Sequence, residues 1–112
     1  GNLPLWLSQT QVNIIPVNNE YHLNYAKEIY NLLKDNNIRV ELDDRDEKLS
    51  YKMRESQTNK IPLTLILGDN ELKDNTISYR THGKKETTTL EKNKFIDLVK
   101  KTIKNKKDNI NI

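Results

Sequence analysis

The first part of the chain alternates between two hydrophobic periods. Residues 12–17 form a short, mostly β-branched run, which predicts a buried strand whose ladder ends at Pro16. Residues 20–36 carry apolar side chains at intervals of three and four, which predicts a helix, and residues 38–42 alternate as a half-buried strand does. The inward positions of this helix are expected to be Leu23, Ala26, Ile29, Tyr30 and Leu33.

The second part of the chain predicts another helix and strand, then a hairpin and a terminal helix. Thr88 with Glu91 makes a capping-box pattern before that terminal helix. The expected inward side chains are Leu49, Met53 and Gln57 in the first of these helices, and Phe95, Leu98, Val99 and Ile103 in the last. The predicted elements begin with a loop over residues 43–47, a helix from Lys48 or Leu49 to Thr58 and a strand over 61–67. A polar segment over 69–75 follows. Strands over 76–80 and 86–89 then flank a turn at 82–84, and the last helix ends the order.

This order of elements predicts an α/β fold of three layers. Two successive strand–helix–strand units require right-handed crossovers and give a parallel core. The hairpin after Gly68 adds antiparallel edge strands, so we expect a mixed five-stranded sheet with helices on both faces. In such sheets ligands bind at the carboxyl ends of the parallel strands. The loop over residues 43–47 and the turn over 68–71 both lie at such an end.

Length and composition describe one domain that tolerates an anionic partner. The chain has 112 residues, of which 31% are charged and 34% hydrophobic. Its net charge is +3 and its pI about 9.1. It has no cysteine, which excludes disulfides and thiolate metal sites and fits a cytoplasmic protein. No apolar run approaches the roughly 20 residues needed to span a bilayer.

The residues that enzymes use for catalysis do not form a recognisable pattern. We find no phosphate-binding glycine loop, no His-Glu-x-x-His and no Cys–His pairing. His22 and His82 are expected to be solvated polar side chains. The carboxylates of residues 43–47 are oxygen ligands of the kind that divalent cations prefer, but Arg45 and Lys48 are interleaved with them and no glycine lets this loop wrap an ion. We therefore predict neither a metal site nor a catalytic residue.

Residues 45–60 hold five bases and three acids, a pattern with two interpretations. Acids and bases three or four apart stabilise an exposed helix, so this stretch could be a solvated, salt-bridged face. It could equally bind single-stranded RNA, with lysine and arginine on phosphates and carboxylates accepting from the N–H groups of guanine or uracil. Arginine can also donate to guanine O6 and N7 together. Tyr51 is either a stacking platform for a base or a packed ring.

Several segments resemble the C-terminal anticodon-binding domain of bacterial threonyl-tRNA synthetases. The resemblance is carried by Arg45-Asp46-Glu47-Lys48-Leu49-Ser50-Tyr51-Lys52-Met53-Arg54-Glu55, by Lys60-Ile61-Pro62 and by Gly68-Asp69. Leu3-Pro4-Leu5-Trp6-Leu7-Ser8 is similar to the segment that leads out of the catalytic domain of that family. The resemblance covers Leu3 to Lys107. It implies a linker over residues 1–10, an anticodon-binding domain over 11–107 and a frayed tail over 108–112.

The resemblance also implies a function and a set of site residues. The domain would bind the anticodon stem-loop of threonine tRNA and read its second and third bases, guanine and uracil. Arg80 resembles the guanine-reading arginine of the family, and Glu71 and Asp46 resemble base-contacting positions. Asp46 stands where many members have asparagine; an ionised carboxylate accepts hydrogen bonds but cannot donate them. Lys60 is similar to a basic residue near the anticodon, and Arg45, Lys48 and Lys52 would be backbone contacts.

The parent protein implied by the resemblance is a threonine–tRNA ligase that uses ATP, magnesium and a catalytic zinc. That chemistry would belong to an upstream domain of a cytoplasmic homodimer, and this fragment would carry neither a cofactor nor a catalytic site. Two alternatives remain open. The chain could be a stand-alone accessory or regulatory module, or a metal-dependent nuclease domain built on Asp44-x-Asp46.

Overall fold

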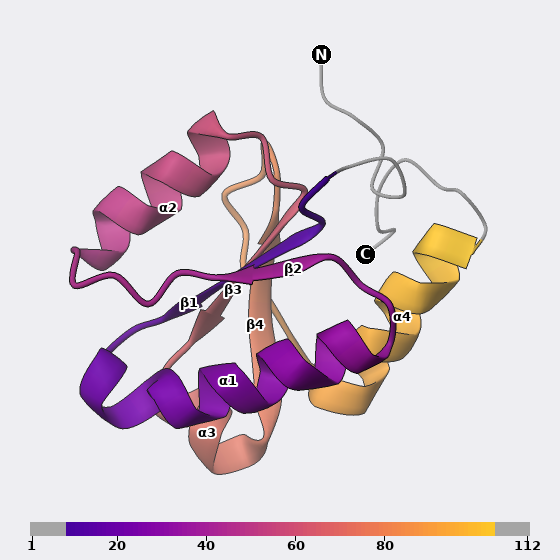
Figure 1. Ribbon diagram of the computed structural model, residues 1–112, viewed down its shortest axis with the longest axis horizontal. Helices are drawn as coiled ribbons and strands as arrows, with labels where there is room; N and C mark the ends of the chain where they lie inside the picture. Colours follow the sequence, from indigo (N-terminus) through magenta and orange to yellow (C-terminus); the bar gives the residue numbers. More distant parts are fainter. Residues whose placement is uncertain (1–8, 105–112) are drawn as a thin grey trace.

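The computed structural model describes residues 9–104 and contains five strands and four helices (Figure 1). The predicted α/β class is confirmed. In chain order the elements are β1 (Val12–Pro16), α1 (Asn19–Asp35), β2 (Val40–Leu42), α2 (Leu49–Thr58), β3 (Leu63–Leu67), α3 (Asp69–Asp74), β4 (Thr76–Thr81), β5 (Thr88–Glu91) and α4 (Lys92–Lys104).

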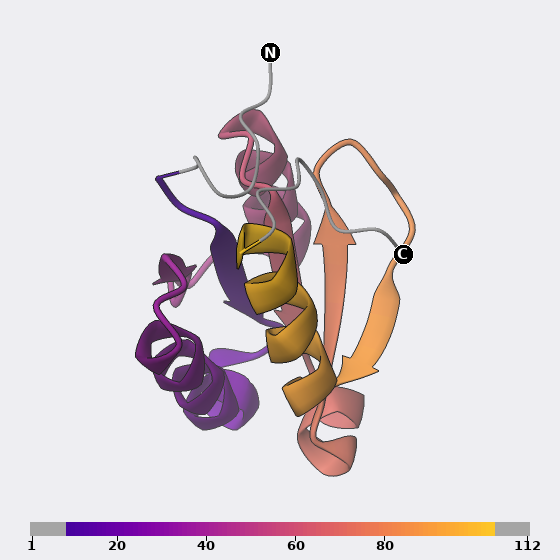
Figure 2. The ribbon, with the colours of Figure 1, turned by 90° about the vertical axis from the view of Figure 1, so that its right-hand side faces the viewer.

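The strands form one mixed sheet in the order β2-β1-β3-β4-β5. β1 is parallel to both β2 and β3, whereas β4 is antiparallel to β3 and β5 is antiparallel to β4. α1 and α4 cover one face of this sheet and α2 lies on the other, as Figures 1 and 2 show. The predicted three-layer, mixed five-stranded architecture is therefore confirmed.

The face under α1 and α4 carries the hydrophobic core. Leu65 of β3 pairs in register with Ile14 of β1 on one side and Tyr79 of β4 on the other, and all three are buried. The ring of Tyr79 lies 5.0 Å from that of Phe95 on α4. Because side chains alternate across a strand, the residues between these positions point to the opposite face of the sheet.

The opposite face of the sheet carries polar side chains beside the apolar pair Ile15 and Ile66. Asn13, Thr64 and Arg80 lie in one row across β1, β3 and β4. α2 packs on β1, and its Ser56 Oγ lies 2.6 Å from Thr64 Oγ1. The same face extends beyond α2 over the part of the sheet nearest β5. We call this part the open face; it consists of Ile66 on β3, Ser78 and Arg80 on β4, Thr87 just before β5 and Thr89 on β5.

Two local predictions were wrong near the hairpin. The polar segment after Gly68 forms the short helix α3, because Glu71 folds back to accept the N–H of Gly68 at 2.8 Å. Thr88 does not cap the last helix, because it belongs to β5 and pairs with Tyr79. β5 thus begins two residues later than predicted, and Glu91 accepts the N–H of Asn93 instead.

The inward face of α2 also differs from the prediction. Leu49, Met53 and Gln57 are only half-buried, whereas Lys52 and Ser56 are buried. The reason is that α2 packs on the polar face of the sheet, where Ser56 finds a hydroxyl partner. Hydrophobic periodicity cannot locate a buried face whose contacts are polar.

The described residues include only part of the predicted linker and none of the predicted tail. Most of the predicted linker, residues 1–8, and all of the predicted tail over 108–112 lie outside the described residues. In the part that the structure describes, no helix combines the length and the apolar character needed to cross a bilayer.

We expect Leu65→Ala to lower the free energy of unfolding by about 2–5 kcal/mol. Leu65 is fully buried in the central strand, so truncation removes buried apolar surface and leaves a cavity. The matched control is Leu72→Ala on α3, where the side chain is 43% exposed and the loss should stay below about 0.5 kcal/mol. Urea unfolding followed by circular dichroism measures both. Equal losses would contradict the assignment of Leu65 to the core.

Candidate nucleic-acid interface

The three parallel strands end at one edge of the sheet, which we call the carboxyl edge. It consists of residues 17–20 after β1, 43–48 after β2 and 68–74 after β3. The first two segments are joined by the Asn19 side-chain amide, which donates to the carbonyl oxygens of Asp44 at 2.7 Å and Arg45 at 3.3 Å. Five of the seven predicted site residues lie at this edge or on α2, which follows it: Arg45, Asp46, Lys48, Lys52 and Glu71. Arg80 lies farther along β4, opposite Thr64 of β3.

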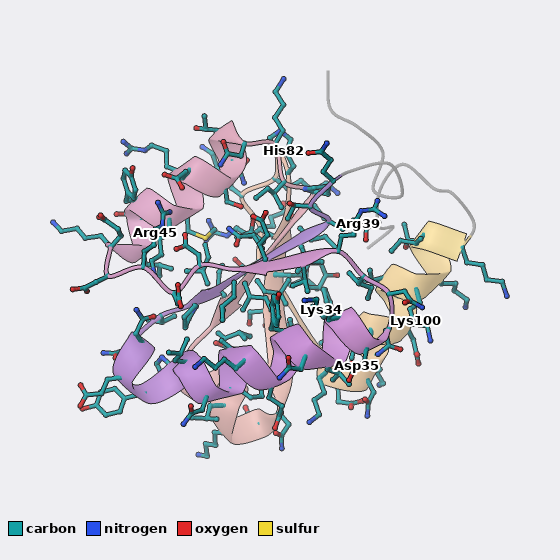
Figure 3. The ribbon with its side chains drawn as sticks, viewed as in Figure 1. Lys34, Asp35, Arg39, Arg45, His82 and Lys100 are labelled. Carbon is teal, nitrogen blue, oxygen red and sulfur yellow. The ribbon has the colours of Figure 1, made fainter. Side chains whose placement is uncertain are left out.

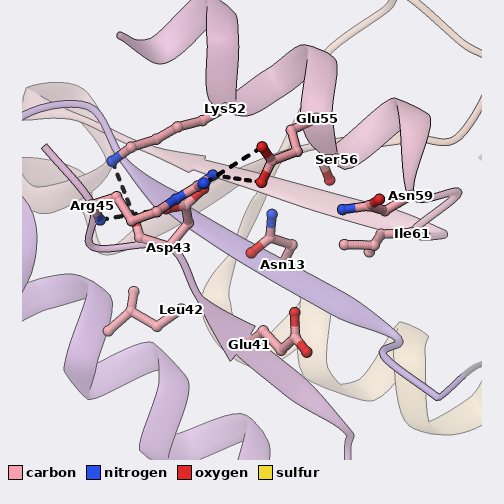
Figure 4. A pocket seen from close by; sticks show the side chains of 10 residues that line it. All are labelled: Asn13, Glu41, Leu42, Asp43, Arg45, Lys52, Glu55, Ser56, Asn59 and Ile61. Atoms are coloured by element: carbon pink, nitrogen blue, oxygen red, sulfur yellow. Dashed lines mark hydrogen bonds and ion pairs between the residues drawn. The ribbon is translucent and has the colours of Figure 1, made fainter. Parts of the chain in front are cut away.

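Arg45 is the centre of an ion-paired network inside the loop at this edge (Figure 4). Its Nε and Nη2 each donate to a different carboxylate oxygen of Asp43 at 2.9 Å. Nη2 also lies 2.7 Å from Oε1 of Glu55 on α2. The guanidinium carbon stands 5.8 Å from the ring centroid of Tyr51, which is 48% exposed. Arg45 therefore ties the loop to the first turns of α2.

Lys52 of α2 also belongs to this network, through the backbone of Asp43. Its side chain is buried, and Nζ donates to the carbonyl oxygen of Asp43 at 3.2 Å. Arg45 and Lys52 are thus brought together around Asp43, one on its carboxylate and the other on its backbone. Arg45 is salt-bridged to Asp43 and Glu55, as one interpretation expected, whereas Lys52 is buried and bonds to a backbone carbonyl. Their predicted contacts with an RNA backbone stay a prediction.

The network changes the protonation behaviour of its members. Hydrogen bonds from the Arg45 guanidinium lower the pKa of Asp43 below its usual value of 3.8, against an opposing effect of burial. Hydrogen bonds to Asp43 and Glu55 raise the pKa of Arg45, which stays charged. A hydrogen bond to Glu55 raises the pKa of Tyr51. The Arg45 guanidinium therefore favours the ionised form of Asp43, while Tyr51 is held in its neutral form.

Asp46 is exposed beside this network, with its carboxylate directed into solvent-accessible space. It lines a hollow of about 320 Å³ that is bounded by the loop after β1, the first turn of α1, Arg45 and Lys52. Lys48 is also exposed and stands at the N-cap of α2 without a side-chain capping bond. Within residues 9–104 no three histidine, aspartate or glutamate side chains converge as a metal-ligand set.

Glu71 lies where the carboxyl edge meets the open face. Oε1 accepts the N–H of Gly68 at 2.8 Å, and Oε2 accepts the hydroxyl of Ser78 at 3.1 Å. Ser78 Oγ is also 2.8 Å from Thr89 Oγ1 on β5. Each carboxylate oxygen has two lone pairs, so Glu71 keeps capacity to accept from a further donor.

Arg80 extends from β4 over the open face, on the same side of the strand as Ser78. Its Nε donates to Thr87 Oγ1 at 2.8 Å. Among the described residues none accepts a hydrogen bond from Nη1 or Nη2 of Arg80. The two terminal amino groups therefore form an oriented, half-exposed fork with donors to spare.

Lys60 is not part of the carboxyl edge. It stands at the other end of α2, before the start of β3, with a backbone φ of 57°. Its N–H donates to the carbonyl of Gln57 at 3.0 Å, and the N–H of Ile61 donates to that of Ser56 at 3.2 Å, which is a Schellman motif. Figure 3 shows that the two ends of α2 lie apart: His82 is near the end that leads to Lys60, and Arg45 is near the beginning of the helix.

His22 corrects a sequence prediction. It is buried rather than solvated, and Nδ1 accepts the N–H of Asn18 at 3.0 Å. Nε2 is therefore the protonated nitrogen, and it lies 2.6 Å from Oδ1 of Asp69 at the start of α3. Because no helix was predicted after Gly68, the sequence offered no sign of this partner. His82 is half-buried, next to the turn after β4.

The fold and this surface define a class: an α/β domain whose open sheet face carries an arginine fork on β4 and, from α3, a carboxylate bonded to Ser78 two residues away. Comparisons with known proteins identify the family of this fold. Residues 11–102 match the family described as "Anticodon binding domain". Two curated relatives, the threonine–tRNA ligases of Oceanobacillus iheyensis and Aquifex aeolicus, are 50% and 47% identical over 96% and 95% of this chain. The chain spans 17% and 16% of their lengths.

A solved structure gives the same fold. The RNA-binding domain of threonyl-tRNA synthetase from Cryptosporidium parvum Iowa II superposes with a TM-score of 0.83 at 24% identity, covering 96% of this chain and 26% of that one. The chain thus belongs to the anticodon-binding domain family. The resemblance to threonyl-tRNA synthetases that the sequence suggested is confirmed by these relatives.

We predict that Asp43→Asn makes stability less dependent on acidic pH. Because the pKa of Asp43 is lowered in the folded state, its ionised form stabilises the fold above about pH 4, and that contribution is lost as the pH falls through the lowered pKa. The difference in unfolding free energy between wild type and variant should shrink between about pH 6 and pH 3. The control is Asp44→Asn, an exposed neighbour. A difference that stays constant with pH for Asp43→Asn would contradict the network.

We predict that Lys60→Gly stabilises the domain by about 0.5–1 kcal/mol. A left-handed backbone costs a lysine about 1–2 kcal/mol, whereas glycine adopts it freely but loses more entropy on folding. Thermal and urea unfolding measure the change. The control is Thr58→Gly in the last turn of α2, which should destabilise by up to about 1 kcal/mol. Destabilisation by Lys60→Gly would show that this backbone is not strained.

Proposed function

We propose that this domain binds the anticodon stem-loop of threonine tRNA and reads its second and third bases, guanine and uracil. Membership of the anticodon-binding family supports tRNA as the partner. The names of the relatives support threonine as the amino acid concerned. The observation that carries the proposal is the fork of Arg80, held by Thr87 and lying two residues along β4 from the Glu71–Ser78 pair.

Arg80 is suited to read guanine. Guanine presents two acceptors, O6 and N7, on one edge, and an arginine fork donates to both. Because Thr87 holds Nε, the orientation of the fork is set before the base arrives. A preorganised donor loses less side-chain entropy on binding than a freely rotating one.

The carboxylates are suited to read base donors. Guanine N1–H and uracil N3–H both donate, so a carboxylate accepts from either. Glu71 is fixed by Gly68 and Ser78, and Asp46 stands free at the rim of its hollow. A surface that bound only phosphates would be weakened by these acids. Glu71 reaches the face that carries Arg80 through Ser78, and an acid there favours base reading over unspecific binding.

The parent protein on this proposal is a threonine–tRNA ligase. Its use of ATP, magnesium and zinc, its homodimeric state and its location in the cytoplasm are properties we infer for that enzyme and not for this chain. The chain spans about a sixth of the related ligases, so the chemistry of aminoacylation would lie in the remainder. The alternative is a stand-alone accessory or regulatory module of the same fold, and a catalytic synthetase domain encoded immediately upstream would exclude it.

We expect Arg80→Ala to weaken binding of the cognate anticodon stem-loop by about 1–3 kcal/mol, which is the value of a bidentate base contact. The same substitution should weaken binding much less for a stem-loop whose second and third anticodon bases are replaced. Fluorescence titration of the two RNAs at a single stated salt concentration measures both losses.

The control for this experiment is Lys27→Ala. It removes one positive charge from an exposed position of α1, on the other side of the sheet. It should affect both RNAs little and equally. If Arg80→Ala weakens the two stem-loops to the same extent, Arg80 contacts phosphate rather than guanine, and the assignment of base reading to it is wrong.

A further inference from the structure

The turn between β4 and β5 carries a cluster of lysines next to Lys60. We call Lys60, Lys84 and Lys85 the basic turn; all three side chains are exposed. None of the three forms an ion pair with any of residues 9–104. Their charges are therefore not used in holding the described fold together.

The basic turn is firmly anchored at the amino end of β3. The N–H of His82 donates to the carbonyl of Pro62 at 2.9 Å, and the N–H of Gly83 to Oε1 of Gln57 at 3.4 Å. A further bond of 3.1 Å from the N–H of Lys84 to the carbonyl of Thr81 closes the turn. These contacts bring two segments more than twenty residues apart to one place. The lysines of both segments consequently stand at the same end of the sheet.

Charge is unevenly distributed between the two ends of the open face. Residues 43–48 and 68–74 at the carboxyl edge hold seven acids and three bases. Residues 59–62 and 82–87 at the opposite end hold three bases, Lys60, Lys84 and Lys85, and one acid, Glu86. A phosphodiester chain is repelled by the first end and attracted by the second. The bases of a bound strand would thus lie toward Glu71, and its phosphates toward the turn.

Lys60 gives independent support through its backbone. The other two non-glycine residues with positive φ are both asparagines, Asn37 and Asn75, which tolerate this conformation better than lysine does. A lysine in a left-handed position costs stability, and such strain is typical of sites with a function. Stability alone would favour glycine or asparagine at this position. The positive charge of the Lys60 side chain is therefore a reason for a lysine there.

We propose that the basic turn is a phosphate-binding site for the RNA strand that crosses the open face. The phosphates that flank the nucleotide read by Arg80 would be bound by Lys60, Lys84 and Lys85. Arg80 itself lies between these lysines and Glu71. The inference rests on the proposed function, and it assigns to three lysines a role separate from base reading. These contacts add affinity and salt dependence but no preference for an anticodon.

The test compares two double variants of the full 112-residue chain. Lys84→Gln with Lys85→Gln removes two charges from the basic turn. Lys100→Gln with Lys101→Gln removes two charges from exposed positions of α4, on the other side of the sheet, and is the control. Both are titrated with the cognate and the base-replaced stem-loops over a range of salt concentrations. Circular dichroism confirms that each variant is folded.

For the turn variant we expect the slope of log K against log salt to fall by about 1.4, because each phosphate contact on a single strand contributes about 0.7. Relative to wild type, the turn variant should therefore gain about 25-fold less affinity when the salt concentration is lowered from 1 M to 0.1 M. The loss should be the same for both RNAs. The control should keep the wild-type slope. Lys60→Gly should lower the slope by about 0.7 while raising stability.

Three results would overturn the inference. If wild type discriminates between the RNAs but the turn variant keeps its slope and affinity, the basic turn binds no phosphate and the proposed function stands. If the control loses as much as the turn variant, only net charge matters. If wild type does not discriminate between the anticodons at all, the proposed function itself fails and the inference falls with it.

Discussion

The register between β3 and β4 is the constraint on which the rest of the structure depends. It places Leu65 opposite Tyr79 on one face and Thr64 opposite Arg80 on the other. A slip of one residue would turn Arg80 into the core and expose Tyr79. The packing of Tyr79 against Phe95 on α4 therefore fixes the direction of Arg80 as well. Core and candidate site are two sides of the same pairing.

The charged stretch after β2 combines the two interpretations that its sequence left open. Arg45 and Lys52 act inside the domain, one on the carboxylate of Asp43 and the other on its carbonyl. Asp46 and Lys48 remain exposed on the loop that those contacts hold. The internal ion pairs give the loop one shape, and a loop with one shape can present its outer side chains at fixed positions. Arg45 and Lys52 thus stabilise the loop, and on our proposal their neighbours Asp46 and Lys48 are the residues left for recognition.

Sequence patterns predicted most of the fold because its core is built from local periodicity. The parallel strands, α1 and α4 follow from apolar spacing alone. The patterns failed where a partner comes from far along the chain, as in the burial of His22 against Asp69 and of Ser56 against Thr64. The positions of Arg80 and Glu71 in the candidate site came from family resemblance. Spacing could not have joined them, because only the sheet brings Glu71 next to Ser78.

One face of the sheet holds the core, and we propose that the other binds RNA. The most direct test is to follow the backbone amide resonances of the domain while the cognate anticodon stem-loop is added. We expect the largest shifts at Ser78, Arg80 and Thr89, with smaller ones in the loop over 43–47 and none near Lys100 on α4. Shifts concentrated along α4, with the open face unchanged, would contradict the account.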